Sequence, residues 1–199
     1  GSQKGLMLPP GLGFNAISEK ALAVSKATGG LPRSYWDWDD MLTANAGGMF
    51  PYTPGTNLLY GLREAIDMLH EEGLDNVFAR HVRHGEATRR AVAAWGLELQ
   101  PVVPEEYSNA VTTIRMPEGN SADAFRKVVL DNFNMSLGSG LGKVADKVFR
   151  IGHLGDFNDL TLAGALCGVE MGLGLAGVPH KTGGVAAAMD FLSGKKQSN

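Results

Sequence analysis

The sequence lacks the features that mark secreted, membrane-spanning and nucleic-acid-binding proteins. It holds a single cysteine, Cys167, which excludes an intrachain disulfide and a thiolate zinc finger and suits a reducing compartment. No apolar run reaches the ~20 residues that a membrane-spanning helix needs. The formal net charge is −3, which argues against a strongly basic nucleic-acid-binding surface. We therefore expect a cytoplasmic protein that binds neither a membrane nor nucleic acid.

The chain has the composition of a folded domain, with an excess of glycine. Hydrophobic residues make up 44% and charged residues 20%, which is typical of globular proteins and not of disordered or coiled-coil chains. Its 199 residues allow one domain of ordinary size, or slightly more. Glycine accounts for 27 residues, well above the usual ~7%. The chain starts at Gly1-Ser2 without an initiator Met, as a cloning scar or a piece of a longer protein would.

The first part of the chain predicts helices and loops with almost no strand. An apolar run that ends at prolines indicates a strand end, and helical spacing with polar cap residues indicates the helices. The elements expected here are a strand end at 6–8, helices at 16–27 after Asn15 and at 37–45, and a long helix from Thr56 that is interrupted at Gly73.

After Gly96, which we expect to cap a helix over 74–95, strands alternate with helices. The expected elements are strands at 110–114, 135–137 and 148–151, and helices at 122–133, 158–175 and 182–192. This order predicts an α+β unit. Because the first ~70 residues contain no sheet to pack against, we expect them to complete a domain whose sheet lies outside this chain.

Two residues are candidates for the chemistry of a site. Lys4 lies in a Gly/Ser-rich turn beside an apolar run, where a desolvated lysine forms Schiff bases with carbonyl groups; spacing alone favours a solvated terminal lysine. Arg150 lies in an apolar strand that meets Gly152. Its planar guanidinium suits bidentate capture of a carboxylate, and an arginine on the solvent face of a strand is the equal alternative.

Other polar residues are weaker candidates. Thr53 lies in a proline-rich loop, where its hydroxyl is either a phosphate contact or a turn residue. His81 and His84 stand three residues apart on a predicted helix, but the surrounding arginines indicate a solvated face and not a metal site. We predict no metal site, and a structural role for His153.

These motifs, taken in order, resemble the C-terminal half of a class V aminotransferase of pyridoxal-phosphate fold type I. The resemblance is strongest to the serine–glyoxylate enzymes and looser to the alanine–glyoxylate and serine–pyruvate enzymes, and it covers essentially the whole chain. The motifs that carry it are Gly1-Ser2-Gln3-Lys4-Gly5 with Pro9-Pro10-Gly11, Tyr35-Trp36-Asp37-Trp38, Phe50-Pro51-Tyr52-Thr53-Pro54 followed by Asn57-Leu58-Leu59-Tyr60-Gly61-Leu62, Ser136-Leu137-Gly138, and Phe149-Arg150-Ile151-Gly152-His153-Leu154-Gly155-Asp156.

The resemblance implies a role for each candidate. Lys4 matches the lysine that forms the Schiff base with pyridoxal 5'-phosphate, and Arg150 matches the arginine that holds the substrate carboxylate. Thr53 matches a residue that reaches the cofactor phosphate of the neighbouring subunit of a homodimer, and Gln3 would lie beside the cofactor phosphate. Phe50 stands where relatives can have a tyrosine, so a hydroxyl contact is in doubt there.

The resemblance also implies an architecture and an activity. Residues 1–70 would be the C-terminal remainder of the large cofactor-binding domain, and residues 71–199 a small α+β domain with an antiparallel sheet, within an overall α/β fold. The expected activity is transamination of serine, or of alanine or aspartate, with glyoxylate. The groups that cradle the cofactor lie in the missing N-terminal half of the family pattern, so we expect the isolated chain to be inactive.

Two other functions stay open at this point. One is a different fold type I pyridoxal-phosphate enzyme, a lyase or a decarboxylase, in which the same lysine would serve. The other is a non-enzymatic α+β binding module, which the composition also allows.

Overall fold

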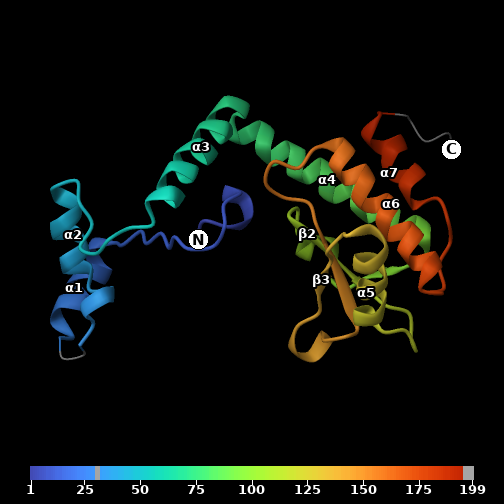
Figure 1. Cartoon of the computed structure of the whole chain (residues 1–199), viewed down its shortest axis with the longest axis horizontal. Helices are drawn as coiled ribbons and strands as arrows, with labels where there is room; N and C mark the ends of the chain where they lie inside the picture. The colour runs from blue at the N-terminus through green and yellow to red at the C-terminus, as the bar shows by residue number, and fades with distance from the viewer. Residues whose placement is uncertain (30–31, 195–199) are drawn as a thin grey trace. The chain divides into compact units, whose positions relative to one another are not determined.

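A computed structural model describes residues 1–29 and 32–194 of the chain, which divides into two compact units, Gly1–Met68 and Leu69–Asn199 (Figure 1). The boundary falls within helix α3 (Thr56–Glu72). That these units are the remainder of a large domain and a small domain stays a prediction. No helix in the described residues is long and apolar enough to cross a membrane.

The first unit is built from helices and loops, with no strand among its described residues. The sequence predicted a strand end at 6–8, and this is wrong. The chain there leaves a short 3-10 helix and turns through Met7, whose φ is 64°. The elements of this unit are η1 (Lys4–Leu6), α1 (Glu19–Ala27), η2 (Ser34–Trp36), α2 (Trp38–Ala46) and the greater part of α3.

Side-chain caps decide where two of these helices begin. Asp37 accepts the backbone N–H of Asp39 at 2.9 Å and starts α2, one residue later than predicted. Ser18 accepts the N–H of Ala21 at 3.2 Å and starts α1. The expected N-cap at Asn15 is therefore wrong: a hydroxyl three residues further along satisfies the first free N–H groups of the helix.

The second unit is an α+β unit, as the sequence predicted. Its helices are α4 (Leu74–Trp95), α5 (Ala122–Phe133), α6 (Asp159–Leu175) and α7 (Gly184–Leu192), with 3-10 turns η3 (Pro104–Glu106) and η4 (Gly142–Val144). Its strands are β1 (Glu98–Leu99), β2 (Val111–Arg115), β3 (Gly138–Ser139) and β4 (Val148–Gly152). They form one antiparallel sheet in the order β1-β2-β4-β3.

Strand β3 lies three residues beyond the strand predicted at 135–137. Asn134, in the left-handed region at φ 51°, ends α5, and Leu137 is buried in the core. Pairing with β4 begins only at Gly138, which stands opposite Arg150. Strand β3 starts where β4 is available for pairing, so a tertiary contact sets the position of its first residue.

One face of the sheet packs on the helices and forms the core. Along β4 the side chains alternate: Phe149 and Ile151 are fully buried, while Arg150 between them lies on the opposite face. Phe149 packs against Phe125 of α5 with ring centroids 4.7 Å apart. The same cluster includes Trp95 of α4 together with residues of α6 and α7. The sheet face that carries Arg150 is thus separate from the core.

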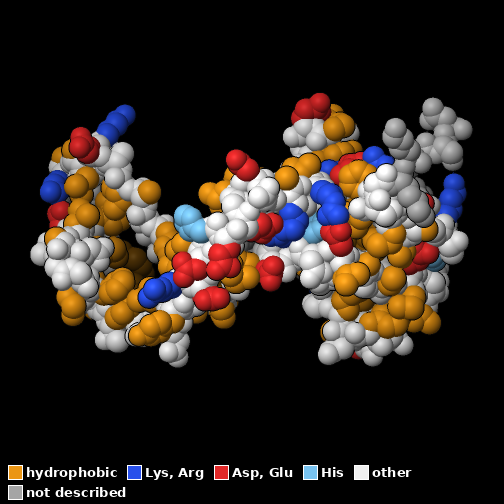
Figure 2. Space-filling view, turned by 90° about the horizontal axis from the view of Figure 1, so that it is seen from above, with side chains coloured by type: hydrophobic (Ala, Val, Ile, Leu, Met, Phe, Trp, Pro, Cys, Tyr) orange, Lys and Arg blue, Asp and Glu red, His pale blue; other side chains and the backbone are white. Residues whose placement is uncertain are grey.

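The first unit has no comparable core. Ala65 is the one buried apolar side chain among its described residues. Several large side chains are well exposed, including Trp36 at 73%, Tyr60 at 71% and Met49 at 67%. Hydrophobic atoms accordingly show at the surface in the space-filling view (Figure 2).

Candidate active site

Lys4 sits at the tip of a loop that is closed by Ser2. The Ser2 side chain is fully buried; its hydroxyl donates to the Pro9 carbonyl at 2.8 Å and accepts the Leu12 N–H at 3.1 Å. Lys4 has a φ of 68°, in the left-handed region that non-glycine residues rarely occupy. Such a conformation persists only when its surroundings impose it. The loop thus holds an exposed lysine, and the Lys4 amine bonds to no other described residue.

The lysine loop packs on the first turns of α3. A Cβ built on Gly61 of α3 would lie 2.9 Å from Leu8 Cδ2, and one built on Gly11 would lie 2.6 Å from Leu58 Cδ1. A side chain at either position would force the leucine that it meets to move, so glycine favours this close approach of loop and helix. The loop with Lys4 therefore rests on the helix that directly follows the loop with Thr53.

The loop with Thr53 is anchored through its neighbour Tyr52. The Tyr52 hydroxyl lies 3.3 Å from Ser34 Oγ, and its ring centroid lies 5.1 Å from that of Tyr35. Thr53 is exposed, and its hydroxyl has no hydrogen-bond partner among the described residues. Phe50 is 50% exposed. This loop presents a free hydroxyl at its surface.

Arg150 is half-buried and lies on the sheet face that points away from the core. It stands between Thr113 of β2 and Gly138 of β3 in the strand register. Its Nε is buried and has no hydrogen-bond partner among the described residues, and its guanidinium makes no ion pair with them. A buried donor without a partner costs free energy, so the arrangement fits an arginine whose partner is a ligand.

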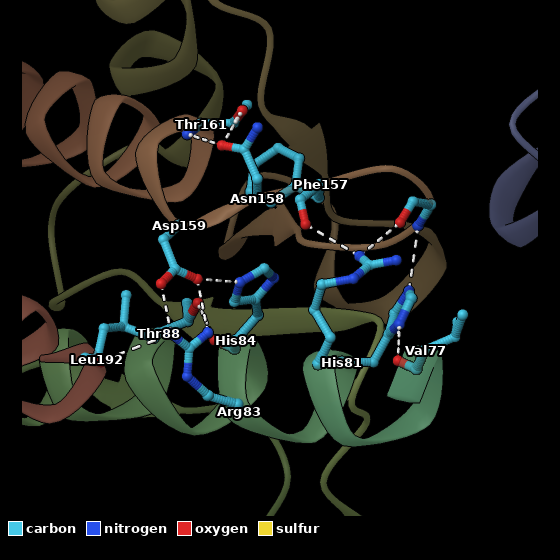
Figure 3. A network of polar contacts seen from close by, with 12 residues as sticks. Val77, His81, Arg83, His84, Thr88, Phe157, Asn158, Asp159, Thr161 and Leu192 are labelled. Atoms are coloured by element: carbon cyan, nitrogen blue, oxygen red, sulfur yellow. Dashed lines mark hydrogen bonds and ion pairs between the residues drawn. The ribbon is translucent and has the colours of Figure 1, made fainter. Parts of the chain in front are cut away.

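The segment that follows β4 is held by α4 (Figure 3). Arg80 donates to the carbonyls of Gly155 and Phe157 at 2.8 and 2.9 Å, and its other nitrogens pair with both Glu72 oxygens at 2.7 Å. His81 Nε2 accepts the Gly155 N–H at 3.1 Å. The hydrogen bond to Glu72 raises the pKa of Arg80 above its ordinary value. The segment that follows the Arg150 strand is thus held at Gly155 and at Phe157.

Asp159, the first residue of α6, completes this network. It pairs with Arg83 through both oxygens and with His84 Nε2 at 2.8 Å. The hydrogen bond from Arg83 lowers the pKa of Asp159 to about 2. Burial lowers the pKa of His84, although Asp159 acts against this.

The location of His84 corrects the sequence interpretation. The arginines around His81 and His84 suggested a solvated face, yet the His84 side chain is fully buried. Among the described residues, no group of three His, Cys, Asp or Glu side chains is placed to hold a metal. Sequence reasoning missed these α4 anchors because their partners lie about 75 positions further along the chain.

The candidate residues fall into two groups. Gln3, Lys4, Phe50 and Thr53 belong to the first unit, and Arg150 belongs to the second. Within the first unit, the lysine loop packs on helix α3, and the loop with Thr53 leads directly into the same helix. Gln3 is exposed beside Lys4.

Known proteins are similar to this chain over nearly its whole length. It is 53% identical to the serine–glyoxylate aminotransferase of Methylorubrum extorquens, over 96% of the chain and 49% of that protein. It is 46% identical to the L-aspartate–glyoxylate aminotransferase of Paracoccus denitrificans, over 96% and 48%. The structure of pyridoxamine–pyruvate aminotransferase from Mesorhizobium loti aligns with a TM-score of 0.89 at 30% identity, over 98% of this chain and 51% of that one. No protein-family model matches.

These similarities confirm the resemblance drawn from the motifs. The chain is related over nearly its whole length to the class V aminotransferases, and its fold is that of about half of a pyridoxal-phosphate fold type I enzyme. Within this class it is similar to the serine–glyoxylate aminotransferases. The chain spans about half the length of the curated relatives it matches.

Proposed function

We propose that this chain is part of a pyridoxal-phosphate-dependent aminotransferase that transfers the amino group of a small amino acid to glyoxylate. The products are glycine and the matching 2-oxo acid. Serine is the proposed donor, because the relatives at 49–53% identity carry that name; aspartate, named in a relative at 46%, and alanine are the alternatives. The observation that carries the proposal is Arg150, which lies on the sheet face opposite the core and whose guanidinium has no partner among the described residues.

Arg150 would bind the α-carboxylate, the group that every substrate of this reaction shares. Transamination passes an amino acid and a 2-oxo acid through one pocket, so one anchor serves both. The planar fork of the guanidinium makes two parallel hydrogen bonds to a carboxylate. A two-carbon substrate such as glyoxylate offers few other groups to hold.

The residues of the first unit fit the cofactor. The Lys4 amine and the Thr53 hydroxyl have no partners among the described residues, so both are available to the cofactor. Lys4 would bind the cofactor covalently through its aldehyde carbon, and Thr53 would donate a hydrogen bond to its phosphate. When bound, pyridoxal phosphate supplies the electron sink at the reacting carbon. Lys4 would then move the proton between the substrate α-carbon and the cofactor C4′. Gln3 would lie beside the phosphate, and Phe50 supplies no hydroxyl.

Two partners belong to the proposal. Thr53 would serve the site of a neighbouring subunit, so the working enzyme would be a homodimer. The remaining contacts to the cofactor would come from the other half of the enzyme. The enzyme therefore needs more of the protein than this chain alone.

The test uses the full-length enzyme loaded with pyridoxal phosphate. Adding serine should bleach the visible absorbance of the bound cofactor, and adding glyoxylate should restore it with formation of glycine. Alanine and aspartate are compared at equal concentration. Serine consumption that does not require glyoxylate would favour a lyase or decarboxylase, and a protein with no visible absorbance would favour a binding module; either result contradicts the proposal.

A further inference from the structure

Gly138 leaves the space in which the Arg150 side chain lies. The two residues face each other across the β3–β4 pair. A Cβ built on Gly138 would lie 2.9 Å from Arg150 Cβ, 3.1 Å from its Nε and 3.5 Å from its Cζ. These atoms span the length of the arginine side chain. The arginine thus lies along the position that any side chain at 138 would occupy.

The same contact explains on which side of the strand the Arg150 guanidinium lies. On the other side of Arg150 stands Thr113, which has a side chain of its own. The missing side chain at Gly138 therefore opens room on the β3 side. With the arginine lying there, its Nε is buried and without a protein partner among the described residues. The direction of the guanidinium and the burial of its Nε therefore go together with the packing of Arg150 against β3.

The backbone gives no separate reason for glycine at this position. Gly138 is not among the glycines with positive φ, so alanine is compatible with its conformation. Glycine inside a strand is otherwise less favourable than alanine, because it loses more conformational freedom on folding. The one observed use of glycine here is the room it leaves for Arg150.

We propose that Gly138 is a positioning residue for substrate binding, because its missing side chain sets the direction in which Arg150 presents its guanidinium. This inference rests on the proposed function, in which Arg150 binds the α-carboxylate. Since the amino acid and the 2-oxo acid both carry that group, Gly138 acts on both substrates alike. It does not touch either substrate itself.

The first test measures kinetics of the full-length holoenzyme with Gly138→Ala and Gly138→Val. The control is Gly152→Ala on β4, where a Cβ would meet only Leu154 Cδ2 at an ordinary 3.5 Å. We expect KM for serine and for glyoxylate to rise about tenfold with alanine, the loss of roughly one charged hydrogen bond, and further with valine. The control should stay within about twofold. Unchanged KM values in both Gly138 variants would overturn the proposal.

A double-mutant cycle separates positioning from a general structural role. In an Arg150→Ala background no cationic side chain is left to direct, so Gly138→Ala should no longer change KM for either substrate. Thermal unfolding of each variant checks that the fold persists. An equal rise in KM in the wild-type and Arg150→Ala backgrounds would mean that Gly138 acts without Arg150, and the proposal would be wrong.

A readout that needs no activity keeps the two proposals distinguishable. The Nε–H signal of Arg150 in a ¹⁵N NMR spectrum, assigned by its loss in Arg150→Lys, should shift in Gly138→Ala and stay in place in Gly152→Ala. If the wild-type enzyme showed no transamination, the proposed function would fail while this signal still reported on the packing. A signal that does not move in Gly138→Ala would overturn the positioning role.

Discussion

The two units of the chain are stabilised in different ways. The second unit buries Trp95, Phe125 and Phe149 in one cluster that joins its sheet to its helices. The first unit buries Ala65 alone among its described apolar residues and exposes most of its aromatic side chains. Nevertheless, four of the five candidate site residues lie in the first unit. The candidate site residues and the core are therefore concentrated in different parts of the chain.

This difference indicates how each unit depends on the rest of the enzyme. An extended apolar surface marks a place where other protein packs, so we expect the first unit to be stable only within the whole enzyme. The second unit has its own core and its own polar anchors between α4 and the segment after β4. Substitutions should therefore separate the units by their effect on activity and on stability.

The largest expected effect is on activity and belongs to the first unit. Lys4→Ala removes the amine that would hold the cofactor and move the proton, so turnover should fall by at least ~10²–10⁴-fold. The free energy of unfolding should hardly change, because Lys4 is exposed and its amine bonds to no other described residue. Steady-state rates and urea unfolding of the full-length holoenzyme measure both. Lys20→Ala on exposed α1 is the matched control; equal activity in the two variants would contradict the role of Lys4.

The next effect is on stability and belongs to the second unit. Phe149→Ala leaves a cavity against Phe125 and should lower the free energy of unfolding by about 3–5 kcal/mol. Val102→Ala, at a position of the same unit that is 88% exposed, should change it by no more than about 0.5 kcal/mol. Urea unfolding of the full-length enzyme measures both variants. Equal losses in the two variants would show that the burial of Phe149 does not stabilise the second unit.

Arg150→Lys tests the one site residue that the second unit carries. The ammonium keeps the charge and loses the planar fork, which should cost about 1.5–3 kcal/mol of substrate binding. This corresponds to roughly a ten- to a hundredfold loss in kcat/KM for both substrates. The absorbance of the bound cofactor should stay normal. If the kinetics of both substrates were unchanged, Arg150 would be a strand-surface arginine and not the carboxylate anchor.

The smallest expected effect is the pH dependence of the stability of the second unit, which depends on a buried histidine. His153 is fully buried, its Nδ1 donating to Asn109 O at 3.1 Å and its Nε2 accepting from Thr112 Oγ1 at 2.8 Å. Burial lowers the pKa of His153 to about 4. Its unfolded pKa is about 6.5, so protonation favours the unfolded chain. The contribution of neutral His153 to the free energy of unfolding is fully present above pH ~6.5 and is lost as the pH falls towards 4. At pH 5 the loss is about 2 kcal/mol.

Urea midpoints of the full-length enzyme between pH 7 and pH 5 test this, with His153→Gln as the comparison. The variant should be less stable at pH 7 and should lose less stability on acidification, because the group that titrates is gone. Equal pH dependence in the two proteins would show that His153 does not titrate in this range.

Elements bounded by local signals were predictable from the sequence. Helix α5 has the predicted bounds because Ser121 accepts the Ala124 N–H at 3.0 Å and Asn134 takes the left-handed conformation at its end. Gly96 ends α4 as expected, again in the left-handed region. In both cases the signal lies within a few residues of the helix end. The start of α1 was wrong because Asn15 and Ser18 are both acceptable caps and only the fold chose between them.

The sequence by itself determined the class of fold, the mainly helical character of the described part of the first unit, and the motifs that carry Lys4 and Arg150, since each depends on residues close together in the chain. The tertiary structure alone decided the start of β3, the burial of His84 against Asp159, and the packing of Arg150 over Gly138. These contacts join residues between 12 and 75 positions apart. Their geometry follows from strand register and helix packing, which no local pattern of residue types encodes.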